Sequence, residues 1–418
     1  MKNRRQFIKT ATAGAASLML PHPAYSEILN LFGGPYFIHL HLGGGWDTSL
    51  FCDPHVEINS ELKQVAFHDK LGVTHHYGDL TFNSQKGLEE FGSTQEFMDR
   101  YLGNMTIFNG IRCQSNGHAT AIKIAARGIY SPLYPNISAL YSRSILDQLN
   151  LRIPLPYMTS TSGADKNTNN LLSAVGIPTA SAFNNIVNLN ALPANKTLHS
   201  DANQELLEVA FRARLENQAS HASFLAENQL LSHLLKINQS LDHFKLIQEN
   251  IEQYPIKTSK GIQQLSSDEV VLACMASGAT ASASLWDGGW DSHSNNFQVQ
   301  KKRYQQVFHR IDKLIRAAET MGIKDKIILY VSSDFGRTPA TKEHNGGRDH
   351  WTIGSSFLWS SSFETKVFGK TNSQLIPEEE WNFTTAHLHE ELRDILKIDS
   401  DLRKRYELSV NSLGLMKA

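Results

Sequence analysis

The chain has 418 residues, of which 41% are hydrophobic and 19% are charged, and its formal net charge is -1 at neutral pH. This length allows one large α/β unit or two domains. The balanced charge predicts no nucleic-acid partner, and no apolar run beyond the N-terminus approaches the roughly 18–20 residues that a membrane span requires. Three cysteines form no CxxC pair and are expected to be free or buried; they are Cys52, Cys113 and Cys274.

The first 26 residues have the features of a twin-arginine export signal. Arg4 and Arg5 precede Phe7, and a weakly apolar stretch then leads to small residues near Ser26. A basic region, an apolar region and a small-residue cleavage site define a signal peptide, and paired arginines indicate the twin-arginine route. The alternative is an amphipathic opening helix. We expect residues 1–26 to be removed, the twin-arginine translocase to be a transient partner, and the protein to reach the periplasm or the cell exterior.

The remaining residues, 27–418, predict a single α/β domain. A capping box at 266–269 opens an expected helix over 270–277, and apolar residues at helical spacing predict another over 297–321. The polar stretch 155–262 is expected to be a mainly helical insertion or cap. Strands that alternate with helices favour a mostly parallel sheet with helices on both faces. The predicted strands, which are short apolar runs, lie at 35–42, 105–108, 279–285, 326–331 and 355–359.

Acidic and histidine side chains follow three of these strands. Ligands of open parallel sheets bind outside the carboxyl ends of the strands, so we expect these side chains to converge. Carboxylate oxygens and imidazole nitrogens suit zinc, manganese or iron. A single aspartate after a strand is more often a turn or a helix cap, but several such segments at one edge favour a metal site. The predicted ligands are Asp47, Asp291, His293, Asp334 and His350.

Two arginines near these segments are candidates for binding an anionic substrate. Arg337 and Arg348 can make bidentate hydrogen bonds to such a group. They can equally form structural pairs with Asp349 and Glu343, and the sequence does not decide between these roles.

Five other histidines are interpreted as structural or secondary. His39 and His41 share one face of a strand and are expected to be buried against a helix. His344 is a weak spare ligand in a loop. His387 and His389 begin a helix expected over 388–396, where a surface role is favoured.

Three segments resemble the motifs of a known family. Trp-Asp-Ser-His at 290–293, Ser-Asp-Phe-Gly-Arg-Thr-Pro at 333–339 and Gly-Gly-Arg-Asp-His-Trp at 346–351, behind a twin-arginine signal, are similar to those of the bacterial domain-of-unknown-function family fifteen hundred and one. That family is grouped with the alkaline phosphatase and sulfatase superfamily. The resemblance implies an alkaline phosphatase-like three-layer fold and a hydrolase that acts on a small anionic ester, such as a phosphate or a sulfate.

The resemblance also implies how the ligands are divided. Asp291, His293 and His350 would hold one ion, with zinc or manganese favoured, and Asp47 and Asp334 would hold a second. Alkaline phosphatases have a histidine directly after the aspartate at the position of Asp334, whereas this chain has phenylalanine there. The second ion is therefore expected to be calcium or magnesium, or to be absent.

The nucleophile departs from the superfamily pattern, in which it is serine, threonine or modified cysteine. Counting as in sulfatases places His118 at that position, as a nucleophile, a general base or a third ligand. Ser115 and Thr48 are the hydroxyl alternatives. Because the usual nucleophile is missing, the main alternative to an enzyme is a catalytically degenerate metal-binding protein with a structural or interaction role. A non-haem iron enzyme, which uses two histidines and a carboxylate, is the remote alternative.

Overall fold

The computed structural model describes residues 32–83, 90–150, 153–160, 266–340, 344–378 and 381–416, together with isolated residues between 171 and 249. The predicted signal at 1–26 lies outside the described residues. So does the predicted insertion at 155–262, apart from 155–160 and the isolated residues. Within the described part of the chain, no helix is both long and apolar enough to cross a membrane.

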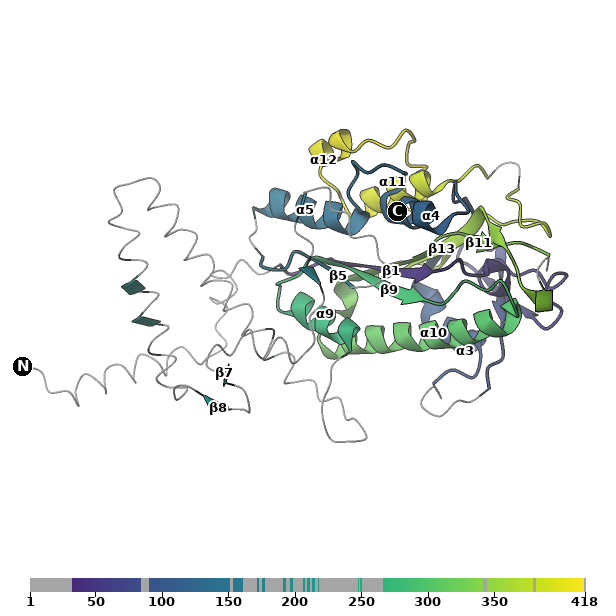
Figure 1. The fold of residues 1–418 in the computed structure, drawn as a ribbon, viewed down its shortest axis with the longest axis horizontal. Coiled ribbons are helices and arrows are strands. Elements are labelled where there is room, and N and C mark those ends of the chain that lie inside the picture. The colour runs from purple at the N-terminus through teal and green to yellow at the C-terminus, as the bar shows by residue number, and fades with distance from the viewer. Residues whose placement is uncertain are drawn as a thin grey trace, which may run out of the picture.

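An eight-stranded sheet forms the centre of the fold, between two layers of helices (Figure 1). The order is β14-β4-β13-β10-β1-β9-β5-β6, and every neighbouring pair is parallel except those that include β13. The predicted mostly parallel, three-layer α/β fold is therefore confirmed. The strands are β1 (Tyr36–Gly43), β4 (Met105–Arg112), β5 (Tyr157–Thr159), β6 (Val175–Gly176), β9 (Ser282–Gly288), β10 (Ile327–Ser333), β13 (Ile353–Trp359) and β14 (Lys366–Phe368).

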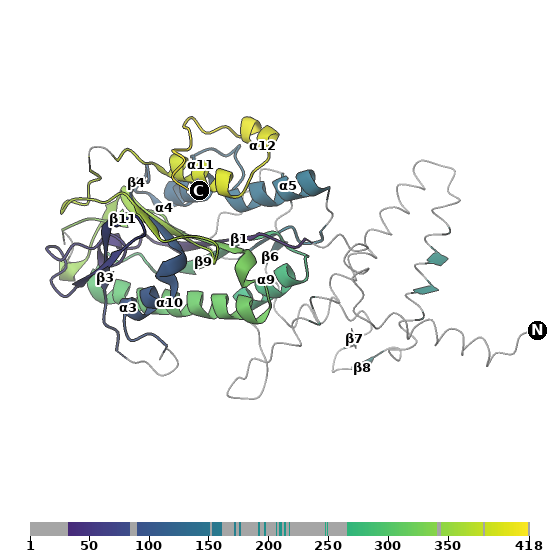
Figure 2. The same ribbon diagram turned by 180° about the vertical axis from the view of Figure 1, so that it is seen from behind.

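The helices divide between the two faces of this sheet. One face is covered by α3 (Thr94–Tyr101), α9 (Ser267–Ala276) and α10 (Asn296–Thr320) (Figures 1 and 2). The other is covered by α4 (His118–Arg127), α5 (Ile137–Leu149), α11 (Thr385–Ile395) and α12 (Ser400–Arg405). Smaller elements are the strands β2 (Lys63–His68), β3 (Thr74–Asp79), β7 (Ala191–Leu192), β8 (Lys196–Thr197), β11 (Gly336–Arg337) and β12 (His350–Trp351), and the 3-10 helices η2 (Thr48–Leu50), η3 (Leu102–Asn104), η4 (Lys324–Lys326) and η5 (His344–Gly346).

Most predicted elements are present, with small differences at their ends. All residues of β1 are buried because the strand lies between β9 and β10 in the middle of the sheet. The capping box of α9 is formed by Ser266 and Glu269. The strand predicted from residue 279 starts only at Ser282, since the N–H of Ala279 still donates to the carbonyl of Cys274 at the end of α9. The three cysteines are free and buried, as expected.

The predicted surface role is wrong for His389. This side chain is 1% exposed, and its Nε2 lies 3.0 Å from the carbonyl oxygen of Ala125 in α4, on which α11 packs. His387 is half-buried and completes a capping box with Thr384. The helix therefore begins at Thr385, earlier than predicted.

Buried His389 should make the protein less stable in acid. Burial lowers its pKa from 6.5 to about 3. Between about pH 6.5 and pH 3 the unfolded chain binds a proton at this histidine that the folded chain does not bind. The free energy of unfolding therefore falls as the pH falls through this range. One proton corresponds to about 1.4 kcal/mol per pH unit. We expect His389→Gln, which keeps a donor for the carbonyl of Ala125, to show a shallower decline between neutral and mildly acidic pH in urea denaturation.

The matched control for this measurement is His68→Gln, which changes an exposed histidine of β2. Its decline in stability should equal that of the unchanged protein. A decline that is equally steep in His389→Gln would contradict the assignment.

Candidate metal centre

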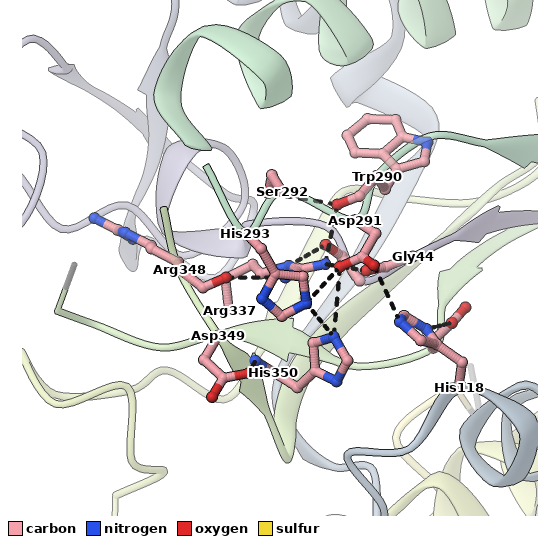
Figure 3. A network of polar contacts seen from close by, with 12 residues as sticks. Gly44, His118, Trp290, Asp291, Ser292, His293, Arg337, Arg348, Asp349 and His350 are labelled. Atoms are coloured by element: carbon pink, nitrogen blue, oxygen red, sulfur yellow. Dashed lines mark hydrogen bonds and ion pairs between the residues drawn. The ribbon is translucent and has the colours of Figure 1, made fainter. Parts of the chain in front are cut away.

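The predicted site residues gather at the carboxyl ends of the central strands. Asp291 follows β9, Asp334 follows β10, and His118 is the first residue of α4, after β4. His350 begins β12, where it lies opposite Arg337 of β11. Segments far apart in the sequence thus turn polar side chains toward one another at one edge of the sheet (Figure 3).

Two Gly-Trp-Asp segments are anchored in the core by their tryptophans. Trp46 and Trp290 are buried, and their ring centroids lie 6.1 and 5.1 Å from that of Tyr304 on α10. Gln300, also on α10, donates to the carbonyl oxygen of Trp290 and accepts from the backbone N–H of Asp47. One helix therefore fixes where both loops leave the sheet.

Glycine is required at two places where the loops meet. Gly44 has a φ of +126°, and a Cβ there would lie 2.4 Å from the backbone nitrogen of Asp291. A Cβ on Gly347 would lie 1.8 Å from the carbonyl oxygen of His293. Any side chain at either position would push apart the segments that carry the candidate ligands.

Asp291, His293 and His350 point three ligand atoms at one another. His293 Nε2 lies 2.9 Å from His350 Nε2 and 3.0 Å from Asp291 Oδ1, and His350 Nε2 lies 3.4 Å from the same oxygen. Tetrahedral zinc, with ligands at about 2.0–2.2 Å, holds them roughly 3.3–3.6 Å apart. The three atoms are within a few tenths of an ångström of that spacing, and two imidazoles with one carboxylate form a donor set that zinc accepts.

Two further combinations of side chains at this place could also hold a metal ion. One consists of His118, Asp291 and His350, and the other of His293, Asp349 and His350. In each combination the ligand atoms lie within 4.8 Å of one another. His350 belongs to both, so it lies at the centre of the candidate site.

Arg337 forms an ion pair with Asp291 from the buried side of the cluster. Its side chain is 0% exposed, and its Nη2 donates to Asp291 Oδ1 at 2.6 Å. Burial opposes ionisation of Asp291, but the hydrogen bond and charge of Arg337 outweigh it, so the pKa of Asp291 is lowered. The guanidinium also donates to the backbone carbonyls of Gly44, Gly45, Trp290 and Arg348. This geometry favours the structural role over a substrate contact, with Asp291 as the acidic partner.

Asp334 links two histidines. Its buried Oδ1 lies 2.6 Å from His41 Nε2, and its Oδ2 lies 2.6 Å from His118 Nδ1. Burial opposes ionisation, but these hydrogen bonds outweigh it and hold the pKa of Asp334 well below its usual value. The hydrogen bond to Asp334 raises the pKa of His118 in turn. His118 Nε2 faces the other way and lies 3.5 Å from Asp291 Oδ2 (Figure 3).

The hydrogen bonds continue from Asp334 into the sheet. His41 Nδ1 lies 3.4 Å from Ser332 Oγ, which lies 2.8 Å from His39 Nε2. An ionised Asp334 only accepts, so His41 Nε2 and His118 Nδ1 both carry the hydrogen. Neutral His118 therefore presents the lone pair of its Nε2 to the cluster. His39 and His41 are buried as expected, but the contact of His41 with Asp334 was not predicted.

Phe335 places an apolar ring beside two imidazoles of the cluster. It is buried, and its centroid lies 4.9 Å from the ring of His118 and 4.4 Å from the ring of His350. It offers no ligand atom, but it packs against both imidazoles and restricts their rotation.

Asp47 is not brought into this cluster. Its carboxylate is 0% exposed; Oδ1 accepts from Ser49, while Oδ2 accepts from Asn296 at 2.6 Å and from Arg348 at 2.8 Å. Arg348, itself buried, also donates to Asn59. Hydrogen bonds reach both oxygens of Asp47 and both oxygens of Asp334, and the second ion between these two carboxylates stays a prediction. Since Arg348 donates to Asp47, it serves this carboxylate rather than a substrate.

The hydroxyl alternatives to His118 point elsewhere. Thr48 is buried in η2, the helix that Asp47 caps. Ser115 Oγ accepts from the backbone N–H of Gly117 at 3.2 Å. His344 begins η5, and its side chain lies outside the described residues. Of the three catalytic candidates, His118 is the one that contacts the ligand cluster.

The residues 36–360 match the family described as "Protein of unknown function (DUF1501)". No curated protein matches the sequence. Among solved structures, the chain is similar to alkaline phosphatase from the Antarctic bacterium TAB5, with 8% identity and a TM-score of 0.38 over 88% of this chain and 100% of that chain. It is also similar to the C-terminal periplasmic domain of EcEptC from Escherichia coli, solved in complex with Zn, with 12% identity and a TM-score of 0.35 over 88% of this chain and 84% of that chain.

Proposed function

The chain belongs to the family described as "Protein of unknown function (DUF1501)", and from this premise we propose that it is a metal-dependent hydrolase of a small anionic ester, such as a phosphate or a sulfate. The membership confirms the resemblance that the motifs predict. In this proposal Asp291, His293 and His350 hold one ion, with zinc or manganese favoured by the donor set. Residues 1–26 support export by the twin-arginine translocase to the periplasm or beyond.

His118 carries the catalytic part of the proposal. Its Nδ1 is held by the buried carboxylate of Asp334, while its Nε2 is turned toward Asp291 at 3.5 Å. A bound divalent ion would polarise the ester and acidify a water molecule. His118 Nε2 accepts the proton of the water that attacks the phosphorus or sulfur, the bond from that atom to the ester oxygen breaks, and the imidazolium then returns the proton to the departing oxygen. Asp334 stabilises this imidazolium without taking its proton. This oriented pair is the observation that favours an enzyme over the metal-binding protein without catalysis.

The test combines metal analysis with activity. Protein purified from its native export route should contain zinc or manganese and should hydrolyse members of a panel of aryl phosphates and sulfates. His118→Asn should keep the metal but lower kcat by about 100-fold or more, the contribution typical of a general base. Ser115→Ala, at the same loop, should leave kcat unchanged.

Three results would contradict this proposal in different ways. Protein without bound metal would remove the metal centre altogether. Bound metal without hydrolysis of any ester would favour the degenerate metal-binding protein, and bound iron would favour the non-haem iron enzyme.

A further inference from the structure

A cavity lined by both polar and apolar groups lies apart from the metal centre and includes none of its candidate ligands. It has a volume of about 650 Å³, within the range of small-molecule sites. Its walls are the segment after η2, the hairpin of β2 and β3, the end of β14 and the loop that follows β14. Because β14 runs parallel to β4, this cavity opens at the same edge of the sheet as the metal centre.

The floor of the cavity is a buried hydrogen-bonded chain. Thr371 Oγ1 lies 2.7 Å from Asp53 Oδ2 and 3.0 Å from His55 Nε2. The other ring nitrogen of His55 lies 3.0 Å from Glu57 Oε1 at the exposed rim. Asp53, His55 and Thr371 are all buried, so a carboxylate that would normally face water is held inside the protein.

Asn109 adds an acceptor without a donor. This wall residue is 2% exposed, and its Nδ2 donates to the carbonyl oxygen of Cys52 at 2.7 Å. Its Oδ1 is buried and has no hydrogen-bond partner among the described residues. A buried acceptor without a donor is unfavourable, so Asn109 leaves one polar position of the cavity wall unsatisfied.

The charges and rings of the lining specify the ligand further. Three carboxylates, those of Asp53, Glu57 and Glu378, face one lysine, Lys370, which gives a formal charge of -2 when the histidines are neutral. The indole of Trp381 and the imidazoles of the hairpin contribute aromatic surface. Aromatic surface and carboxylates together attract ammonium groups on organic molecules.

An inorganic ion suits this cavity less well than an organic cation. Among the described residues, the groups able to hold a metal ion lie at the metal centre, and none of them includes a residue of this cavity. The carboxylates are therefore too widely spaced to bind one small ion. We propose that the cavity binds a small organic cation that carries an ammonium group, with its donors directed to Asp53 and the rim carboxylates of Glu57 and Glu378.

The charge of the cavity depends on pH in a way that supports this ligand. Burial raises the pKa of Asp53 to about 6, against the opposing effects of Thr371 and His55, and nearby Glu378 raises it further. Asp53 is therefore charged above about pH 6 and becomes neutral below it. Affinity for a cation should therefore fall as the solution is acidified and the Asp53 carboxylate loses its charge.

Titration calorimetry on the intact protein tests the proposal with three probes of similar length: putrescine, butanediol and succinate. Putrescine should bind in a saturable manner at pH 7.5 and several-fold more weakly at pH 5.5, whereas butanediol and succinate should not bind. Glu57→Gln and Glu378→Gln change exposed rim residues and should each weaken putrescine binding several-fold. The matched control is Glu319→Gln, since Glu319 forms an exposed pair with Lys324 at 2.8 Å much as Glu378 does with Lys370 at 2.9 Å.

Absence of saturable putrescine binding would overturn the proposal, as would equal binding of butanediol or undiminished binding by the double variant of Glu57 and Glu378. The inference does not rest on the proposed hydrolase activity. The two rim variants should keep the metal content and ester hydrolysis of the unchanged protein, so that failure of either proposal is visible without the other.

Discussion

Replacing His293 by alanine is expected to remove most of the bound metal. The change deletes one of three converging ligand atoms and leaves Asp291 and His350, whose atoms lie 3.4 Å apart. Removing a residue that only hydrogen-bonds to a metal ligand typically lowers the metal affinity by about 10–100-fold. Removing a ligand itself should therefore lower the metal affinity by at least about 100-fold. Ester hydrolysis should be lost in proportion. Competition with a coloured chelator measures the affinity, and elemental analysis measures the content.

The control for this change is His68→Ala, because His68 is an exposed histidine on the hairpin and far from the ligand cluster in the sequence. It should retain the full metal content. The side chain of His293 is 41% exposed, so its replacement should leave the fold intact, which circular dichroism would check. Equal metal content in His293→Ala and in the unchanged protein would rule out the assigned ligand set.

Replacing Arg337 by alanine is expected to lower the free energy of unfolding by roughly 2–3 kcal/mol, since buried carbonyls lose a charged donor whose hydrogen bonds contribute about 1.5–3 kcal/mol each, while the partner Asp291 is 44% exposed and can be solvated. The change leaves the carboxylate of Asp291 without its cation and several backbone carbonyls without a donor. The free energy of unfolding of Arg337→Lys should lie between those of the unchanged protein and Arg337→Ala. A lysine restores the charge but cannot make the same set of hydrogen bonds. Urea denaturation in the presence of a chelator isolates this effect from metal binding.

An exposed arginine provides the comparison. Arg143 pairs with Asp147 one turn along α5, and Arg143→Ala should cost only about 0.3–0.5 kcal/mol. If Arg337→Ala cost as little as this control, the buried hydrogen bonds of Arg337 would not be what holds the loops of the site together.

The sequence correctly predicts the position of those site residues that directly follow a strand. The runs that form β9 and β10 are recognised as strands from the sequence, and a polar residue that follows a central parallel strand must lie at its carboxyl end. Asp291 and Asp334 are therefore placed correctly at the edge of the sheet. The antiparallel direction of β13 was not predicted, because a short apolar run carries no direction.

Contacts across the sheet could not be predicted in the same way. His41 meets Asp334 because β1 and β10 pair with Leu42 beside Ser333, and nothing in either strand specifies that register. The alternation of His39 and His41 in an apolar strand was the available signal, since buried histidines need polar partners. Asp47 likewise meets Arg348 through loop packing, which local patterns do not encode.

The position of β1 also determines when the metal centre can form. Tyr36 lies beside Ile327 and Phe37 beside Ser282, so the first central strand has no partners in the middle of the sheet until most of the chain has been made. Pairings between such distant segments slow folding. His350 comes later still, which means that a growing chain cannot assemble the three ligands. In the proposed hydrolase, metal uptake would thus be tied to completion of the fold, and the ion would stabilise only chains that have folded.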